Sequence, residues 1–352
     1  MIDRVQAWLG DRIPFRSIRD FATHKTVPVH VASPWYYFGG MALFLFAVQI
    51  FTGSLLLLYY RPSSAEAFES VQFIMTKVSF GWLIRSIHAW SANLMVFFLF
   101  VHMFSCFFLK AYRRPREMTW VTGCALLGVT LFLAFSGYLL PWNTLSFFAT
   151  SIGTETGKVV PVVGDFLVRF LRGGSEVSGA TLTRFFAWHV ALLPATVAGI
   201  LGIHLALIQM QGMSVPVSVQ PPVKSIRFFP NFLTREFLAW TLALGALASL
   251  AAFFPAELGV KADPSSSAPE GLKPEWYFLF AYQTLKLLPA KVAGIEGEVL
   301  GVFAISLGGL VWLLVPFLDR KSARNERSPL FTALGVVAIL YFAGMTLFGW
   351  MS

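Results

Sequence analysis

Charged residues are scarce in this 352-residue chain, where Asp, Glu, Lys and Arg make up 13% of the residues and hydrophobic residues make up 56%. A soluble domain needs more polar surface than this composition provides, so a soluble globular protein is excluded. Negatively charged residues are the fewer, with 18 Asp and Glu against 27 Lys and Arg, so the formal net charge is +9. Because that positive charge is spread over separate loops, we expect no nucleic-acid partner.

Cysteine is also rare, since the chain has only Cys106 and Cys124, both in apolar stretches. They form no CxxC or CxxCH arrangement. Neither a disulfide framework nor covalent attachment of a cofactor through such a motif is therefore indicated. We expect both to be small buried hydrophobic residues.

Long apolar runs are what the chain has in abundance. Seven of them are long enough to cross about 30 Å of hydrocarbon at about 1.5 Å per helical residue. They cover approximately residues 35–59, 86–109, 118–140, 185–208, 237–255, 298–318 and 330–350. Each should be a helix, because backbone polar groups in lipid have to be paired within their own segment. The predicted fold class is an all-α integral membrane protein with seven transmembrane helices.

The loops between these runs carry unequal positive charge. Those on the side of the N-terminus hold 16 of the 27 Lys and Arg although the opposite loops are longer. By the positive-inside rule, we expect a cytoplasmic N-terminus and a C-terminus on the outer, electrochemically positive side of a membrane such as the bacterial inner membrane. Residues 1–34 contain five basic residues and no short apolar core. We expect them to be an amphipathic segment on the cytoplasmic face, not a cleavable signal.

A Pro-rich stretch at residues 215–222 divides the chain. Residues 35–210 carry four spans, and residues 211–352 carry three spans and a long outer loop at 256–297. The other long outer loop, 141–184, has an amphipathic pattern near residues 159–171. We therefore expect short surface helices at that face.

Four of the six histidines lie in two spans. His88 and His102 are 14 residues apart in the second span, and His189 and His204 are 15 apart in the fourth. Fourteen residues rotate a helix by about 1400°, roughly 40° short of four turns, and advance it by about 21 Å. Because the two spans run in the same direction, we expect an outer pair and an inner pair. Two facing imidazole pairs at matched depth are what two hexacoordinate haems require.

A packing role or a different metal is the alternative for these four histidines. A single histidine in a span is about as often a hydrogen-bonded packing residue as a functional one, but four at matched spacing are hard to account for in that way. A metal other than haem iron stays open, although the spans offer no mixed ligand set for it.

Glycines repeat the same spacing on the flanking spans. Gly39 and Gly53 in the first span, and Gly123 and Gly137 in the third, are also 14 residues apart. A glycine lets a flat macrocycle lie against the helix backbone, so one at each level suits the haem hypothesis. Close packing between helices is the alternative, because transmembrane helices are rich in glycine for that reason.

Several motifs resemble the cytochrome b/b6 family, and the resemblance covers nearly the whole chain. The most specific stretches are GWLIRSIH at 81–88, RRPREMTW at 113–120, GYLLPW at 137–142 and PEWY at 274–277. The histidine spacing and TLTRFF at 181–186 resemble cytochrome b6, and three spans follow the boundary as in subunit IV. The resemblance implies a four-helix haem-binding bundle followed by a three-helix C-terminal domain, as if cytochrome b6 were fused to subunit IV.

The resemblance also implies the cofactors. His88 and His189 would bind a low-potential outer haem b, and His102 and His204 a high-potential inner haem b. Arg85 and Arg184 match family positions that hold propionates of the outer haem, since a guanidinium offers paired donors to a carboxylate. The alternative for either arginine is that it extends to the interface from the end of its span.

The PEWY stretch resembles the quinol-oxidation motif of the family. Glu275 would accept a proton from a bound quinol, beside Pro274, Trp276 and Tyr277. Tyr138 and the loop after Pro141 should help to form the wall of the pocket. Without the resemblance, Glu275 in a Pro-rich loop would be interpreted as a solvated charge.

Some positions depart from the family pattern. Tyr37 stands where the b6 type has the cysteine that attaches an extra haem, so we do not expect that covalent haem. Ser105 replaces an arginine three residues after His102. The candidates to hold a propionate of the inner haem are therefore Arg113, Arg114 and Arg116.

The inner quinone site is also less typical of the family. Gln209 replaces a basic residue of the b6 type. Glu236 resembles the acidic residue that delivers protons to this site in bc1 proteins, but an interfacial ion pair with Arg235 is an equal alternative.

The resemblance predicts the cytochrome b subunit of a bc-type quinol:cytochrome c oxidoreductase that works by a Q-cycle coupled to proton translocation. Its partners would be a Rieske iron–sulfur protein, a c-type cytochrome, membrane lipid and a second copy in a homodimeric complex. A dihaem quinone-reducing anchor of a dehydrogenase or hydrogenase is the main alternative, because it needs no quinol-oxidation motif. A transporter that relays protons through histidines is another.

Overall fold

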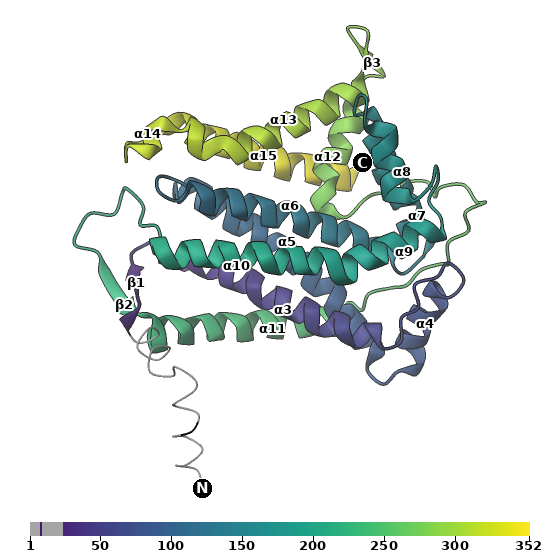
Figure 1. The fold of residues 1–352 in the computed structure, drawn as a ribbon, viewed down its shortest axis with the longest axis horizontal. Helices are drawn as coiled ribbons and strands as arrows, with labels where there is room; N and C mark the ends of the chain where they lie inside the picture. Colours follow the sequence, from purple (N-terminus) through teal and green to yellow (C-terminus); the bar gives the residue numbers. More distant parts are fainter. Residues whose placement is uncertain (1–7, 9–23) are drawn as a thin grey trace.

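The computed structural model describes residue 8 and residues 24–352. The segment predicted at 1–34 therefore lies for the most part outside the described residues. The seven predicted spans are confirmed as long helices that run side by side (Figure 1). They are α3 (Tyr37–Leu57), α5 (Gly81–Phe108), α6 (Glu117–Leu139), α9–η3–α10 (Gly179–Gln211), α11 (Leu233–Phe253), α13 (Gly297–Leu318) and α15 (Pro329–Met351).

Helix ends differ from the prediction where polar caps extend a helix beyond the hydrocarbon. The fourth span begins at Gly179, not near 185, because Ser178 and Thr181 exchange hydrogen bonds in a capping box. Within this span α9 (Gly179–Ala187) and α10 (Leu193–Gln211) are joined by a wider turn, η3 (Trp188–Leu192). An apolar run in the sequence indicates only the part of a helix that crosses the hydrocarbon, so it does not predict where the capped end of the helix lies.

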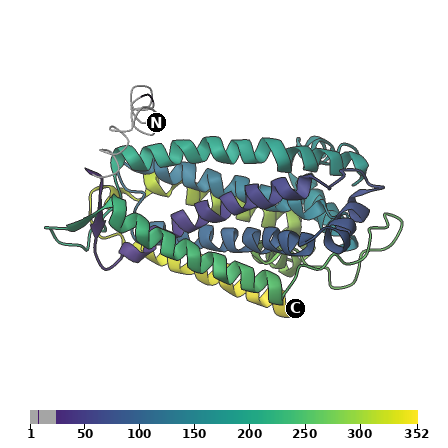
Figure 2. The ribbon, with the colours of Figure 1, turned by 90° about the horizontal axis from the view of Figure 1, so that it is seen from below.

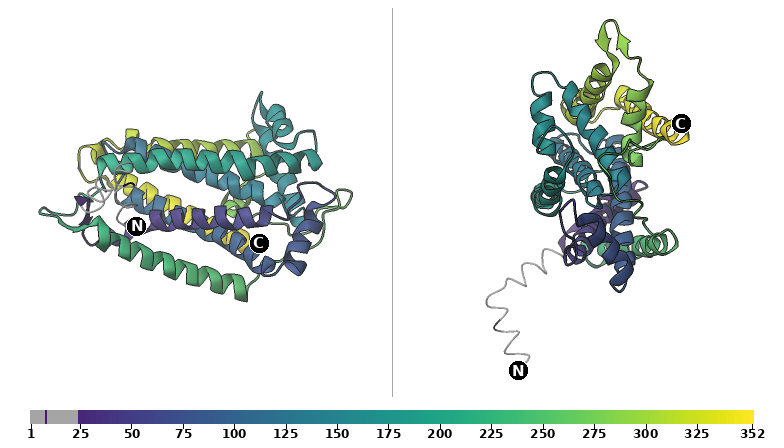
Figure 3. Two further views of the ribbon diagram at one scale, coloured as in Figure 1. Left: turned by 60° about the horizontal axis from the view of Figure 1, so that its bottom comes forward. Right: turned by 90° about the vertical axis from the view of Figure 1, so that its right-hand side faces the viewer.

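The central bundle consists of α3, α5, α6 and α10, and the C-terminal spans flank it on two sides. Helix α11 packs against α3 and α5, whereas α13 packs against α6 and α15 against α5. Figure 1 shows α11 below the bundle and α13 and α15 above it, and the end-on view in Figure 3 shows the same separation. Figure 2 shows the length over which α10 and α3 run along the bundle.

Short elements cover the end of the bundle that carries α4 (Ala67–Lys77), α7 (Thr144–Glu155), α8 (Gly164–Arg172) and α12 (Trp276–Leu287). Following the charge prediction, we call this the outer end. Arg172 ties the expected surface helices together, because its buried guanidinium donates to Thr154 and to the carbonyls of Ser151 and Ser175. The hairpin β3 (Lys291–Val292) and β4 (Ile295–Glu296) projects here, and the C-terminus lies at this end (Figure 1).

The inner end is closed by β1 (Thr26–Val29) paired antiparallel with β2 (Lys224–Arg227), a contact that the sequence did not indicate. The π-turn η4 (Phe228–Phe232) then leads into α11. Asp319, 1% exposed, accepts hydrogen bonds from Tyr112 (2.7 Å) and Ser328 (2.7 Å). These bonds compensate the burial of the carboxylate and join the α5–α6 loop to the turn that precedes α15, which includes α14 (Arg320–Ala323).

Candidate functional site

The four span histidines face the interior of the bundle at two levels. His88 on α5 and His189 on η3 lie opposite each other, with ring centroids 6.3 Å apart. A histidine nitrogen lies about 2 Å from a coordinated metal, so two imidazoles on opposite sides of one metal place their centroids about 6 Å apart. The outer pair therefore has the separation that a shared metal requires.

Each of the four predicted glycines lies against one of these histidine rings. A Cβ built on Gly53 would be 3.3 Å from the ring of His88, and one on Gly137 would overlap the ring of His189. At the other level, a Cβ on Gly39 would be 3.1 Å from His102 and one on Gly123 would be 3.3 Å from His204. Each level thus combines two histidines with two glycines, one from α3 and one from α6, so that a side chain on any of them would crowd a ring.

This arrangement fits haem better than a bare metal ion. Within residue 8 and residues 24–352, no group of three or more His, Cys, Asp or Glu side chains could hold a metal. A haem would need only nitrogen ligands from the protein, and the outer histidine pair has a separation that fits this. The glycines leave backbone, not side chains, beside the rings.

The two arginines predicted to hold the outer propionates lie at the outer end and contact backbone carbonyls. Arg85 donates to the carbonyls of Ala256 (2.6 Å) and Glu257 (3.0 Å), and Arg184 donates to that of Phe170. Arg85 thereby fixes the loop that leaves α11. The propionate role of both arginines stays a prediction.

The basic stretch at the inner end has one arginine with a free donor. Arg113 donates one Nη to the carbonyl of Val215, while its other Nη is buried without a partner, as is the hydroxyl of Ser214. Burial, and then the neighbouring cation of Arg116, lower the pKa of Arg113. Arg116 itself donates to the carbonyl of Gln211 (3.0 Å), and Arg114 is exposed. Of the three predicted candidates, Arg113 is the one best placed to receive a buried anion.

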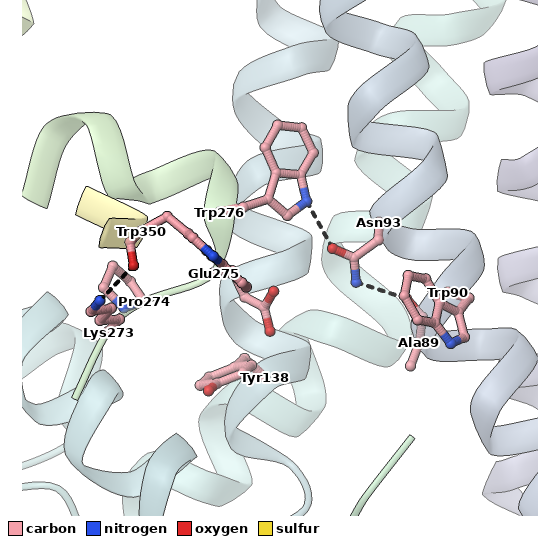
Figure 4. A pocket seen from close by; sticks show the side chains of 9 residues that line it. All are labelled: Ala89, Trp90, Asn93, Tyr138, Lys273, Pro274, Glu275, Trp276 and Trp350. Carbon is pink, nitrogen blue, oxygen red and sulfur yellow. Dashed lines mark hydrogen bonds between the residues drawn. The ribbon is translucent and has the colours of Figure 1, made fainter. Parts of the chain in front are cut away.

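The outer end contains a cavity of about 400 Å³ next to the outer histidine level. Its wall comes from α5, from the end of α6, from the loop that enters α12, and from the end of α15. The lining residues are Ala89, Trp90, Asn93, Tyr138, Lys273, Pro274, Glu275, Trp276 and Trp350. Figure 4 shows the Glu275 carboxylate between the ring of Tyr138 and the side of the cavity formed by Asn93 and Trp90.

The polar groups of this cavity are few and held in place. Burial raises the pKa of Glu275, and burial together with the Glu275 and Tyr138 charges raises that of Tyr277. Trp276 donates its Nε1–H to the side-chain oxygen of Asn93 at 2.9 Å, which fixes the indole across the cavity (Figure 4). A partly buried carboxyl group with a raised pKa, in a mostly apolar cavity, is suited to accept a proton from a lipophilic hydroxyl compound.

The structure brings together part of the predicted quinol pocket. Tyr138, Pro274, Glu275 and Trp276 all line the cavity, whereas Pro141 and Tyr277 do not. Tyr277 instead packs behind the wall against Trp276, with ring centroids 5.4 Å apart.

Sequence reasoning missed five of the lining residues. They are Ala89, Trp90, Asn93, Lys273 and Trp350. Asn93 carried a usable signal, because a polar amide within a membrane span is costly in the same way as an intramembrane histidine. Trp350 had none, since its position depends on how α15 packs against α12.

The residues predicted for an inner quinone site, Glu236 and Gln209, have different hydrogen-bond partners. Glu236 on α11 is 5% exposed, faces α3 at Gly40 and accepts a hydrogen bond from Trp240 at 3.2 Å. Among the ion pairs found in the described residues none involves Glu236, so the alternative of a pair with Arg235 is not observed. Gln209, at the end of α10, accepts a hydrogen bond from Lys25.

Comparison with known proteins identifies the family. A family model described as Cytochrome b/b6/petB matches residues 22–212, and one described as Cytochrome b(C-terminal)/b6/petD matches residues 261–352. The cytochrome bc complex cytochrome b subunit of Chlorobaculum thiosulfatiphilum is 50% identical over 343 residues, which cover 96% of this chain and 79% of that protein. Cytochrome b6 of Synechococcus elongatus is 43% identical over 216 residues, 61% of this chain and 100% of that protein.

A solved structure agrees with these relatives. A chain of the structure titled "Hyperthermophilic respiratory Complex III" superposes with a TM-score of 0.87 at 32% identity, and the match covers 98% of this chain and 91% of that one. Sequence and structure thus agree over nearly the whole length. The chain belongs to the cytochrome b/b6 family, with a b6-like part followed by a part that resembles subunit IV.

Proposed function

We propose that this protein is the cytochrome b subunit of a bc-type quinol:cytochrome c oxidoreductase. The observation that supports this most directly is the position of the cavity beside the outer histidine level. Ala89 and Trp90 of its wall follow His88 directly, and Tyr138 follows Gly137, which touches His189. A quinol that gives up its proton in this cavity would therefore be next to the outer histidine pair.

The residues of the chain would divide the work as follows. Glu275 accepts a proton from the quinol hydroxyl, and Trp276, held by Asn93, and Tyr138 shape the apolar site. His88 with His189, and His102 with His204, would hold two b haems, which would supply one-electron transfer. Arg113 would neutralise a propionate at the inner level.

The products of quinol oxidation leave on two routes in this proposal. Protons leave from Glu275 at the outer end. One electron goes to an external acceptor and the other crosses the bundle to reduce quinone near His204 and Glu236, in a Q-cycle. This scheme is coupled to proton translocation because the two quinone reactions take place at opposite faces of the membrane.

The partners follow from what the chain lacks. Its two cysteines belong to no group of three or more His, Cys, Asp or Glu side chains among the described residues, whereas an iron–sulfur cluster takes four protein ligands from Cys or His. We therefore propose a Rieske protein and a c-type cytochrome as partners, in a homodimeric complex within lipid. The relatives named for a bc complex and for Complex III support such an assembly. We also propose the bacterial inner membrane, with the N-terminus cytoplasmic and the C-terminus outside.

Replacement of Glu275 by Gln tests the proposal. The amide has the same shape but cannot take the proton, so quinol:cytochrome c turnover of the complex should fall about a hundredfold. Glu270→Gln, at an exposed position of the same loop, is the matched control and should keep wild-type turnover. An unchanged rate in Glu275→Gln would favour the quinone-reducing anchor instead. A protein without any b-type absorption would favour the proton-relaying transporter.

A further inference from the structure

A hydroxyl residue directly precedes three of the four glycines that touch the histidine rings. The pairs are Thr52–Gly53, Thr122–Gly123 and Ser136–Gly137, and each hydroxyl lies within hydrogen-bonding distance of Nδ1 of the same histidine that its glycine touches. The fourth glycine, Gly39, follows Phe38, which has no hydroxyl.

Thr52 shows why the hydroxyl matters. Its Oγ1 donates its single hydrogen to the carbonyl of Val48, four residues back in α3, at 2.7 Å. The same Oγ1 lies 2.9 Å from Nδ1 of His88. Because the hydrogen of the hydroxyl is already committed, its oxygen can only accept, and Nδ1 of His88 has to carry the proton.

Thr122 repeats the arrangement at the inner level. Its Oγ1 donates to the carbonyl of Met118 at 2.9 Å and lies 2.9 Å from Nδ1 of His204. The same argument places the proton of His204 on Nδ1. In both histidines, Nε2 is then the unprotonated nitrogen, the one that can bind a metal.

His189 has two acceptors for its Nδ1–H. The hydroxyl of Ser136 lies 3.3 Å from Nδ1 and itself donates to the carbonyl of Leu133 at 2.9 Å. That same carbonyl, which can only accept, lies 3.0 Å from Nδ1. The tautomer of His189 therefore has a backbone anchor in addition to the hydroxyl.

His102 is the exception. Its ring faces the thiol of Cys106, with Sγ 3.8 Å from Nδ1 and 3.9 Å from Nε2. A weak partner almost equally far from both nitrogens selects neither tautomer. Among the described residues no hydroxyl is hydrogen-bonded to this ring. The inner level thus combines one anchored and one unanchored imidazole, whereas both outer imidazoles are anchored.

We propose that Thr52, Thr122 and Ser136 are positioning residues that hold three of the four imidazoles in the tautomer with a free Nε2, and that the inner haem has one unanchored ligand in His102. The proposal rests on haem ligation by these histidines. A hydrogen bond from Nδ1–H to an acceptor makes the imidazole a stronger donor, which favours ferric over ferrous iron. Loss of an acceptor should therefore raise the midpoint potential of the haem at that level and of no other.

Redox titration of the two b-type absorption bands in the purified complex tests this assignment. Thr52→Val should weaken the preference of the outer haem for the ferric state about threefold. For one electron this raises its midpoint potential by about 30 mV. Thr122→Val should shift the potential of the inner haem in the same direction but less, because His204 keeps a backbone hydrogen bond to Thr119. Ser136→Ala should have a smaller effect, because His189 keeps the carbonyl of Leu133.

Matched variants separate the hydroxyl from general packing. Thr52→Ser keeps the hydroxyl and should keep the wild-type potential. Thr130→Val changes a buried threonine of α6 between the two levels. Within the part of the chain that the structure describes, no hydrogen bond joins Thr130 to a histidine, so this variant should move neither haem. Phe38→Thr supplies the missing hydroxyl before Gly39 and should lower the potential of the inner haem.

The outcomes distinguish the inference from the function on which it rests. Two b haems with potentials that do not respond to Thr52→Val, Thr122→Val or Phe38→Thr would overturn the positioning role and leave haem ligation intact. Equal shifts in Thr130→Val would overturn it as well, because the effect would then be one of packing. A wild-type complex without b-type absorption would instead overturn the proposed function itself.

Discussion

The histidine levels in the bundle and the cavity at its outer end draw on the chain in different ways. The four histidines come from two helices and repeat at 14 or 15 residues, so the regular rise of a helix sets their depth. The cavity wall comes from four stretches of chain between residues 89 and 350, one of them a loop. The positions of the histidines therefore depend on helix packing alone. The shape of the cavity also depends on the conformation of the loop before α12 and on the position of the C-terminal end of α15.

Because of this difference, we expect a substitution that displaces a histidine ring to abolish haem binding at that level almost completely. Gly137→Val places a side chain where the ring of His189 lies, so the ring cannot keep its position and the outer haem should be lost. Gly128→Val, on the same helix with open space at its Cβ, is the matched control. The ratio of haem to protein in the purified complex measures the effect. Two haems in Gly137→Val would show that the ring contact does not limit binding.

Sequence periodicity indicates the depth of the histidines and glycines because helix geometry is local and regular. The seven spans are confirmed, and the glycines at 39, 53, 123 and 137 lie against the rings of the histidines. The cavity could be predicted only through the PEWY resemblance, and only in part. Asn93 bonds to Trp276, and Trp350 bonds to Lys273. Both contacts arise from tertiary packing, and no regular spacing in the sequence predicts them.

The chemistry of the cavity should show itself in the pH dependence of quinol oxidation. Glu275 acts as a base only when ionised, and burial raises its pKa. The rate should therefore fall as the pH drops through that raised pKa, at a pH above the value of about 4.3 for an exposed glutamate. Profiles of kcat/KM against pH measure this limb. Glu275→Gln should lack it, and a limb of the same shape in that variant would assign it to another group.

A smaller effect is expected where the cavity wall is held by one hydrogen bond. Asn93→Leu removes the acceptor of the Trp276 indole and leaves a buried N–H unpaired, at a cost of about 1 kcal/mol. The KM for quinol should rise about fivefold, with both haems retained. Trp276→Phe removes the other partner. If the bond is the cause, the double variant should lose less than the sum of the two single losses. Additive losses would mean that the side chains contribute independently.

The smallest effect should come from the point where α15 closes the cavity. Lys273 donates to the carbonyl of Trp350, 2.9 Å away, near the C-terminal end of that helix. A cation at such a position contributes about 0.5 kcal/mol, so Lys273→Met should raise the KM for quinol about twofold. Lys286→Met, at an exposed position of α12, should leave the KM unchanged.

Because the bond between Lys273 and the carbonyl of Trp350 is electrostatic, 1 M salt should reduce the difference in KM between Lys273→Met and the wild type, as it shortens the screening length to about 3 Å. A difference that persists in salt would show that Lys273 acts by filling space at the wall, and the cavity would then resemble the histidine levels in depending on packing alone.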